Sequence, residues 1–489
     1  LMYQMVKTGS YYFLSRPRRF GKSLLISTLE AYFQGKKELF EGLAVEKLEK
    51  DWIKYPILHL DLNIEKYDTP ESLDKILNDN LEYWESQYGT RPSETSFSLR
   101  FAGIIQRACE KTGQRVVILV DEYDKPMLQA IGNEELQKQF RNTLKPFYGA
   151  LKTKDGCIKF ALLTGVTKFG KISVFSDLNN LDDISMWNEY VEICGVSEHE
   201  IHENLETELH EFAAARGITY DKLCEELRDC YDGYHFTHNS IGMYNPFSLL
   251  NAFKRKEFGS YWFETGTPTY LVKLLKKHHY DLERMAHEET DAQVLNSIDS
   301  ESTNPIPVIY QSGYLTIKGY DEEFGMYRLG FPNREVEEGF IRFLLSFYAN
   351  VNKVESPFEI QKFVREVRSG DYNSFFRRLQ SFFADTTYEV IREQELHYEN
   401  VLFIVFKLVG FYVNVEYKTS DGRIDLVLQT DKFTYIMEFK LNGTAEEALR
   451  QINDKHYALP FEMDGRKLFK IGVNFSAETR NIEKWIVES

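Results

Sequence analysis

The sequence predicts an α/β fold with three parts: an N-terminal parallel sheet with helices on both faces, a helical middle region, and a C-terminal α/β domain. Near the N-terminus, apolar strand patterns at 57–62 and 116–120 alternate with helical apolar spacing. Helical patterns then dominate residues 198–254, and a strand–turn–strand–helix order fills residues 412–457. We expect four segments, a core at 1–195, a helical lid region at 196–290, a mixed linker domain at 291–385 and a C-terminal domain at 386–489.

The composition limits the classes of protein that the chain can belong to. Its 489 residues are 43% hydrophobic, enough for several cores, and the net charge of -16 excludes a uniformly basic nucleic-acid coat. Contact with DNA or RNA therefore needs a local basic patch or metal ions. Five scattered cysteines without a CxxC pair favour reduced thiols and a cytoplasmic location. The most apolar run, 401–415, is interrupted by Lys407, and we expect no membrane span.

Residues 13–25 form the first candidate site, a strand end, a loop and a helix that opens on Gly21, Lys22 and Ser23. A phosphate-binding loop has the pattern G-x-x-x-x-G-K-[ST], and here Arg16 occupies the position of the first glycine. Amides at a helix N-terminus bind phosphate, the lysine adds a positive charge, and the serine hydroxyl suits Mg²⁺. The alternative is a basic turn that precedes an amphipathic helix.

The strand at 116–120 delivers Asp121 and Glu122 at its carboxyl end, where open α/β sheets bind ligands. Phosphoryl transfer needs one carboxylate that holds Mg²⁺ and another group that orients or deprotonates water. We therefore expect Asp121 to hold the metal and Glu122 to act as the base. An ordinary strand with an acidic turn is the alternative. A third strand ends at Thr164, which is either a polar sensor beside the γ-phosphate or the cap of a turn.

A second candidate site lies in the C-terminal quarter. Asp425 lies on one predicted strand, and Glu438 and Lys440 project from one face of the next, because strand side chains alternate. Two carboxylates can bind Mg²⁺, which polarises a phosphodiester and activates water, while the lysine stabilises developing charge. The preceding helix carries Glu395 and Glu399 on one face. The alternative is a surface strand pair with alternating charges.

The motifs together resemble the bacterial AAA-ATPase-like proteins that carry a C-terminal nuclease domain of the PD-(D/E)XK superfamily. The resemblance covers essentially the whole chain. The matching motifs are RPRRFGKS at 16–23, VDEYDKP at 120–126, LTGVTK at 163–168, YDGYHF at 231–236, YNPFS at 244–248, ETGTP at 264–268, GRID at 422–425 and EFK at 438–440.

This resemblance implies a P-loop NTPase core, ATP as the nucleotide and a restriction-endonuclease-like C-terminal domain. It also implies that Arg16 is native to the loop and is a candidate nucleotide-binding residue. Arg18 and Arg19 become candidates for phosphate or sheet-edge contacts. Asp425, Glu438 and Lys440 would be the catalytic acids and lysine, with Gln451 as a helix-borne accessory. The superfamily's first-helix glutamate would be Glu395 or Glu399, and the sequence does not choose between them.

We therefore predict an ATP-binding ATPase coupled to a Mg²⁺-dependent nuclease, with DNA favoured over RNA as substrate and a homo-oligomer allowed. One alternative is an ATP-controlled signalling or defence switch with slow hydrolysis, whose C-terminal domain binds nucleic acid without cleaving it. A third interpretation is a nucleic-acid-binding module in which the same acidic residues serve structure only.

Overall fold

The computed structural model of the chain divides into two compact units. The N-terminal unit comprises residues 1–262 and 288–334, and the C-terminal unit comprises 263–287 and 335–489. The four-segment division therefore stays a prediction, because each unit takes two separate stretches of the chain. The structure describes residues 1–168, 175, 178, 180–264, 269–296, 304–349, 356–383, 391–420, 423–441, 443–461, 465–476, 478–479 and 481–489.

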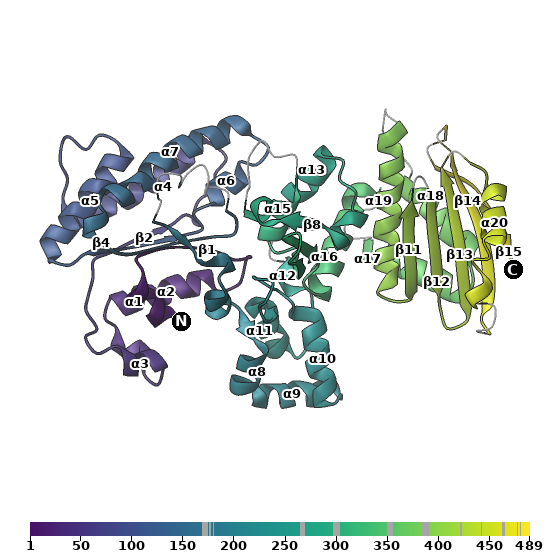
Figure 1. The fold of residues 1–489 in the computed structure, drawn as a ribbon, viewed down its shortest axis with the longest axis horizontal. Coiled ribbons are helices and arrows are strands. Elements are labelled where there is room, and N and C mark those ends of the chain that lie inside the picture. The colour runs from purple at the N-terminus through teal and green to yellow at the C-terminus, as the bar shows by residue number, and fades with distance from the viewer. Residues whose placement is uncertain are drawn as a thin grey trace. The chain divides into compact units, whose positions relative to one another are not determined.

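The core of the N-terminal unit is a parallel sheet in the order β2-β3-β4-β1-β5. Every residue of β1 and β3 is buried, which explains their continuous apolar runs. Helices α1 and α2 lie on one face of the sheet and α4, α5 and α7 on the other (Figure 1). The strands are β1 (Tyr11–Ser15), β2 (Ile57–Asp61), β3 (Val116–Asp121), β4 (Ile158–Gly165) and β5 (Asp182–Asp183). The helices around this sheet are α1 (Met2–Thr8), α2 (Lys22–Phe33), α3 (Ala44–Leu48), α4 (Pro70–Tyr88), α5 (Phe97–Thr112), α6 (Lys125–Gln129) and α7 (Glu134–Thr153).

The strand order determines which residues meet at the carboxyl edge of this sheet. Strand β4 lies between β1 and β3, and Ser15 pairs with Gly165 at the ends of β1 and β4. Asp61 pairs with Asp121 at the ends of β2 and β3. The end of the first strand, the carboxylates of the third and the end of the fourth therefore share one edge.

The rest of the N-terminal unit is mostly helical, as predicted, with a small antiparallel sheet in the order β8-β10-β9. Helix α8 begins with a capping box in which Ser197 and Glu200 satisfy each other's backbone amides. The helices are α8 (Glu198–Asn204), α9 (Glu206–Arg216), α10 (Tyr220–Tyr231), α11 (Pro246–Arg255), α14 (Ala292–Asn296) and α15 (Ile306–Gln311), and α12 (Tyr261–Glu264) crosses the boundary between the units. The strands are β6 (Val196–Ser197), β7 (Met243–Tyr244), β8 (Glu289–Asp291), β9 (Thr316–Asp321) and β10 (Met326–Gly330).

The C-terminal unit contains a five-stranded sheet in sequence order, β11 to β15. Only the β13–β14 pair is parallel, and helix α20 connects these two strands. A Cβ added at Gly472 would lie 2.1 Å from the carbonyl oxygen of Ala445, so this glycine lets α20 approach the sheet closely. The strands are β11 (Asn414–Ser420), β12 (Arg423–Gln429), β13 (Phe433–Leu441), β14 (Lys467–Ser476) and β15 (Asn481–Glu488). The helices are α13 (Thr269–Lys277), α16 (Arg334–Tyr348), α17 (Ser356–Ser369), α18 (Tyr372–Phe383), α19 (Ile391–Gly410) and α20 (Ala445–Asp454).

The structure thus confirms the predicted α/β class, with a parallel sheet first, a helical middle and a C-terminal sheet domain. The apolar run at 401–415 is the buried end of α19 leading into β11. Among the described residues, no helix is both long and apolar enough to cross a membrane.

Candidate functional site

The loop after β1 ends at the N-terminus of α2. Gly21 has φ 93°, a left-handed conformation that favours glycine, and its carbonyl accepts the first hydrogen bond of the helix from Leu25 N at 2.9 Å. Ser23 and Leu24 are exposed, so this helix end opens to solvent. The first amides of a helix have no partner within it, and they carry the positive end of its dipole. The geometry therefore suits a bound phosphate group.

The side chain of Lys22 is 3% exposed, and its ammonium group lies against the loop. Nζ donates to the carbonyl oxygens of Arg16 at 3.1 Å and Pro17 at 3.2 Å. It also lies 3.4 Å from Oε1 of Glu122. The lysine predicted to meet phosphate and the carboxylate predicted to activate water are therefore paired with each other.

Asp121 is 5% exposed and contacts two other predicted residues. Its Oδ2 accepts a hydrogen bond from the Ser23 hydroxyl at 2.5 Å, and its Oδ1 accepts one from the Thr164 hydroxyl at 2.6 Å. A serine hydroxyl beside a carboxylate at a helix N-terminus provides hard oxygen ligands of the kind that Mg²⁺ binds next to phosphates. The donor set therefore fits a magnesium–nucleotide complex.

Thr164 is completely buried at the end of β4 and also lies 3.3 Å from the carbonyl oxygen of Val120. Its observed role is to orient Asp121. Whether it also senses the γ-phosphate stays a prediction.

Glu122 has φ 54°, a left-handed conformation that is costly for a residue with a Cβ. The turn at Glu122 follows the last residue of β3, and the side chain, 20% exposed, meets Lys22 there. Strain of this kind persists where surrounding structure maintains it, and it is concentrated at functional sites.

The residues that follow Glu122 in the turn maintain its left-handed conformation. Tyr123 N donates to the carbonyl oxygen of Thr164 at 3.0 Å, and the Tyr123 hydroxyl donates to that of Thr167 at 2.8 Å. Asp124 is fully buried and accepts hydrogen bonds from Val166 N at 3.2 Å and from the amide and hydroxyl of Thr167, both at 2.6 Å. Burial, with a contribution from the nearby Glu122 carboxylate, raises the pKa of Asp124 to about 6.

Sequence reasoning missed Asp124 and Thr167. The signal for Asp124 was a third acidic residue in the segment 120–126, and it was ambiguous because acidic residues are common in turns.

The three predicted loop arginines point to different partners. Arg16 is 1% exposed and donates to the carbonyl oxygens of Ser15, Ser185 and Tyr190 at 2.8–3.0 Å, while its guanidinium lies 3.9 Å from the centre of the Phe236 ring. These contacts occupy both of its terminal nitrogens, so we do not carry Arg16 forward as a phosphate ligand.

The other two arginines lie on the outer side of the loop. Arg18 donates to the Tyr314 hydroxyl at 3.2 Å and lies 5.2 Å from the Trp262 ring. Arg19 is exposed, with φ 64°, and lies 5.0 Å from the Phe247 ring. A phosphate contact for Arg18 or Arg19 stays a prediction.

In the C-terminal unit, Glu438 on β13 is completely buried. Lys440 Nζ lies 3.4 Å from Oε1 of Glu438 and donates to Oε1 of Gln451 on α20 at 2.5 Å. Asp425 on β12 is the register partner of Glu438, so the backbone places the two predicted acids side by side. The acid, lysine and glutamine therefore converge between β13 and α20, with Asp425 next to them on the neighbouring strand.

The side chains of Asp425 and Glu395 lie outside the described residues. Glu399 is half buried on α19, and the choice between Glu395 and Glu399 stays open. Within the part of the chain that the structure describes, no group of three or more His, Cys, Asp or Glu side chains forms a metal site. The backbone register places positions 425 and 438 opposite each other, and an Asp and a Glu at such positions suit a metal that also binds water and phosphate oxygens.

Comparison with known proteins gives two family models, one for each region that contains a candidate site. A family model described as a predicted AAA-ATPase matches residues 1–175, and one for the PD-(D/E)XK nuclease superfamily matches residues 393–485. A protein of Azotobacter chroococcum mcd 1, described as an uncharacterized protein in the vnfD 5′ region, is 34% identical over 501 residues. The alignment spans 99% of this chain and 93% of that protein.

The chain belongs to the AAA-ATPase-like proteins with a C-terminal PD-(D/E)XK domain. In this family member the first matched region contains Ser23, Asp121, Glu122 and Thr164, and the second contains Glu438, Lys440 and Gln451. The two constellations predicted from the sequence therefore fall in the two matched domains. Family membership gives the chain an ATPase-like and a nuclease-like domain.

Proposed function

We propose that this protein binds and hydrolyses ATP with Mg²⁺ in its N-terminal unit and uses a Mg²⁺-dependent nuclease site in its C-terminal unit, with DNA as the preferred substrate. The observation that carries the ATPase proposal is the contact network of Lys22, Ser23, Asp121 and Glu122. The proposal places the protein in the cytoplasm and allows a homo-oligomer.

Each residue has a distinct task in the ATPase proposal. Lys22 exchanges its carbonyl and carboxylate partners for the β- and γ-phosphates, while Ser23 and Asp121 hold the metal. Glu122, released from Lys22, accepts a proton from the attacking water. Bound Mg²⁺ would supply charge neutralisation on the phosphates.

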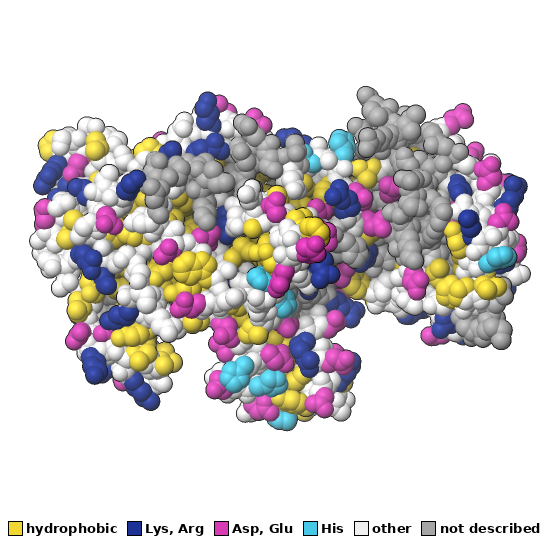
Figure 2. Space-filling view, viewed as in Figure 1, with side chains coloured by type: hydrophobic (Ala, Val, Ile, Leu, Met, Phe, Trp, Pro, Cys, Tyr) yellow, Lys and Arg dark blue, Asp and Glu magenta, His cyan; other side chains and the backbone are white. Residues whose placement is uncertain are grey.

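The nuclease proposal rests on the convergence of Glu438, Lys440 and Gln451, with Asp425 opposite in register. The two carboxylates hold the metal, and Lys440, oriented by Gln451, positions water or stabilises the developing charge on the phosphate. On the face drawn in Figure 2, basic and acidic side chains are interspersed over the C-terminal unit, so local contacts and metal ions would carry nucleic-acid binding there.

The test uses purified full-length protein with Mg²⁺. Nucleotide affinity and phosphate release are measured for wild type, Lys22→Ala and the matched surface control Glu134→Gln, which changes an exposed residue of α7. We expect Lys22→Ala to lose nucleotide binding while the control keeps it. If wild-type protein binds no ATP, the ATPase proposal fails.

Cleavage is assayed separately on plasmid, linear, branched and single-stranded DNA and on RNA. We expect Glu438→Gln to abolish it and Lys484→Ala, an exposed change on β15, two strands away from β13 in the sheet, to leave it intact. Equal cleavage by wild type and Glu438→Gln would remove the nuclease proposal.

One observation favours a second candidate function, an ATP-controlled switch with slow turnover. The loop backbone is held from outside the sheet, because Trp262 Nε1 donates to the carbonyl oxygen of Arg18 at 2.9 Å and Gly195 N donates to that of Phe20 at 3.1 Å. Phe20 itself is fully buried, edge-on to Tyr234. A loop tied in this way would transmit nucleotide binding to the helical region.

For the switch, Lys22→Ala should abolish a nucleotide-dependent change in assembly state, measured by light scattering, without changing any cleavage rate. A steady ATP turnover without such a change in assembly would favour the enzyme proposal instead.

A further inference from the structure

Two of the five cysteines lie next to each other in the N-terminal unit. Cys109 lies near the C-terminus of α5, and Cys157 ends the short 3₁₀ turn at 155–157 that leads into β4. The thiol of Cys109 forms a side-chain hydrogen bond with the sulfur of Cys157. The two thiols are therefore in contact, although the residues are far apart in the sequence.

A second contact holds the 3₁₀ turn against the same helix. The Cys157 thiol donates to Oε1 of Gln106 at 3.5 Å, and Lys154 Nζ donates to the same oxygen at 3.3 Å. Gln106 lies three residues before Cys109, so both side chains project from one face of α5. Cys157 therefore contacts two side chains of that face, which fixes its sulfur beside Cys109.

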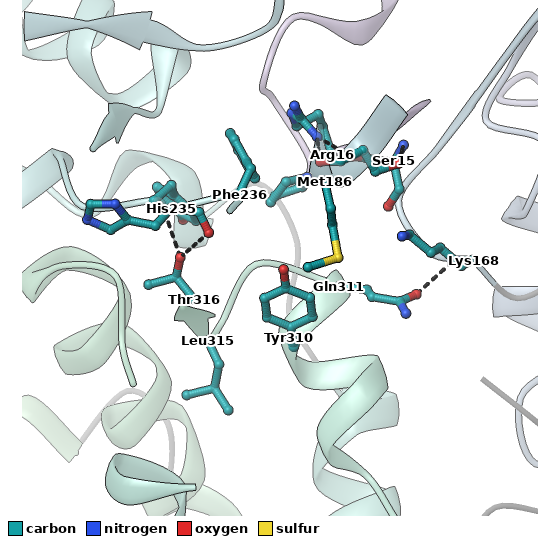
Figure 3. Close-up of a pocket in the computed structure, with 13 residues that line it drawn as sticks. Ser15, Arg16, Lys168, Met186, His235, Phe236, Tyr310, Gln311, Leu315 and Thr316 are labelled. Atoms are coloured by element: carbon teal, nitrogen blue, oxygen red, sulfur yellow. Dashed lines mark hydrogen bonds between the residues drawn. The ribbon is translucent and has the colours of Figure 1, made fainter. Parts of the chain in front are cut away.

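The thiol pair lies at the amino end of β4. The residues of the proposed ATP site lie at the opposite, carboxyl edge of the sheet. The cavity drawn in Figure 3, which Ser15 and Arg16 line, is at that carboxyl edge too, because Ser15 ends β1. Changes at the two cysteines therefore leave the residues of the proposed ATP site in place.

A small oxidant has access to this end of β4. Both thiols are free and half-buried. A Cβ added at Gly156, the residue before Cys157, would meet open space. The surroundings of the pair thus admit a molecule of the size of peroxide, while the fold keeps the two sulfur atoms together.

The two thiols differ in their readiness to react. Burial raises the pKa of the Cys109 thiol, and the hydrogen bond with Cys157 raises it further, while the Arg115 guanidinium acts in the opposite direction. A thiol that keeps its proton is the weaker nucleophile, because the thiolate is the reactive form. Cys157 is therefore suited to react with an oxidant first, and Cys109 is suited to react second.

We propose that Cys109 and Cys157 are a redox-active pair that hydrogen peroxide converts into a disulfide bond. The Cys157 thiolate attacks one peroxide oxygen, the O–O bond breaks, and hydroxide leaves, which gives a sulfenic acid at Cys157. The Cys109 sulfur then attacks the sulfur of the sulfenic acid and gives up its proton, so the S–S bond forms and water leaves. The two thiols together lose two electrons and two protons, and one peroxide becomes two molecules of water.

The disulfide would join α5 covalently to the start of β4. A reducing thiol reverses such a bond, whereas a sulfenic acid without a partner can be oxidised further and irreversibly. Cys109 therefore protects Cys157 from permanent oxidation, and the bond is a reversible modification of the N-terminal unit. The proposal does not depend on the ATPase or the nuclease proposal.

The test exposes the reduced full-length protein to hydrogen peroxide, removes the excess with catalase and blocks the remaining thiols with iodoacetamide under denaturing conditions. The protein should lose two of its five thiols. Peptide mass spectrometry without reduction should identify one crosslinked pair of peptides, which contain Cys109 and Cys157. Dithiothreitol should restore all five thiols.

Two variants separate the roles of the cysteines. Cys109→Ser should accumulate a sulfenic acid at Cys157, so dimedone should label it several-fold more than in wild type, where Cys109 consumes the sulfenic acid. Cys230→Ser is the matched control, because it removes another half-buried cysteine, on α10, and should form the crosslink as wild type does. Far-UV circular dichroism checks that both variants are folded, and the crosslink in wild type depends on neither.

Three results would each overturn the proposal. The first is that the wild-type protein keeps all its thiols under peroxide. The second is a crosslink that joins other cysteines or two separate chains. The third is equal dimedone labelling of Cys109→Ser and Cys230→Ser, which would show that Cys109 does not react with the oxidised Cys157.

Discussion

Changing Glu122 to Gln tests the ion pair between the two central residues of the proposed ATP site. Lys22 and Glu122 are 3% and 20% exposed, with 3.4 Å between their charged atoms. At an effective dielectric constant of about 20, the gross attraction at that distance is roughly 5 kcal/mol, but desolvation and competing hydrogen bonds reduce the net value of such pairs to about 1 kcal/mol. In the proposed function, ATP must break this pair to reach Lys22.

Glu122→Gln removes the charge that competes with phosphate for Lys22. We therefore expect ATP to bind about fivefold more tightly, as a net gain of about 1 kcal/mol implies. Hydrolysis should fall by about 10²- to 10⁴-fold, the usual contribution of a general base. Tight binding and lost turnover would separate the two roles that the geometry gives to Glu122.

The assay combines isothermal titration of Mg²⁺–ATP with a phosphate-release measurement, and Glu134→Gln serves as the surface control. A further comparison tests the backbone, because Glu122→Gly should be more stable than Glu122→Ala by about 1 kcal/mol at the left-handed φ of 54°. Weaker ATP binding by Glu122→Gln, or turnover equal to wild type, would refute the assigned role.

Three further predictions follow from single contacts. A Cβ at Gly165 would lie 2.5 Å from Oδ1 of Asp124, so Gly165→Ala should lower the free energy of unfolding, measured in urea, by about 1–3 kcal/mol. The control is Gly149→Ala in α7, where the added Cβ meets open space. It should be neutral or stabilising by up to about 1 kcal/mol. The pKa of Asp124 is raised to about 6, above its unfolded value near 3.9, so the folded state takes up a proton in this window. The stability of wild type relative to Asp124→Asn should therefore increase as pH falls from about 6 to about 4, and a constant difference across that range would contradict the burial argument. Lys440→Met should abolish cleavage yet leave the protein folded, since Lys440 is partly exposed while Glu438 is completely buried. Cleavage by this variant at the wild-type rate would show that the lysine has no catalytic role.

Much of the candidate ATP site could be predicted because its residues lie at the ends of strongly patterned elements. Ser23 lies in the first turn of a helix, and Asp121 and Thr164 lie at the carboxyl ends of two apolar strands. The rule that ligands bind at the carboxyl edge therefore brings them together. The sequence could not show which way the Arg16 side chain points. Its guanidinium turns toward Ser185 and Tyr190, which are about 170 residues away in sequence, and no local pattern specifies that contact.

The sequence by itself determined the fold class and the family, and it predicted the two candidate sites, because periodicity, strand ends and short motifs are local properties of the chain. Only the tertiary structure decided the partners of each charged group. It paired Lys22 with Glu122, and it buried Asp124, whose carboxylate accepts hydrogen bonds from the backbone amides of Val166 and Thr167. It also buried the Arg16 guanidinium against backbone carbonyls of Ser185 and Tyr190 and the ring of Phe236. These outcomes depend on burial and on contacts between distant segments, which set the energy of a charge and which no stretch of sequence contains.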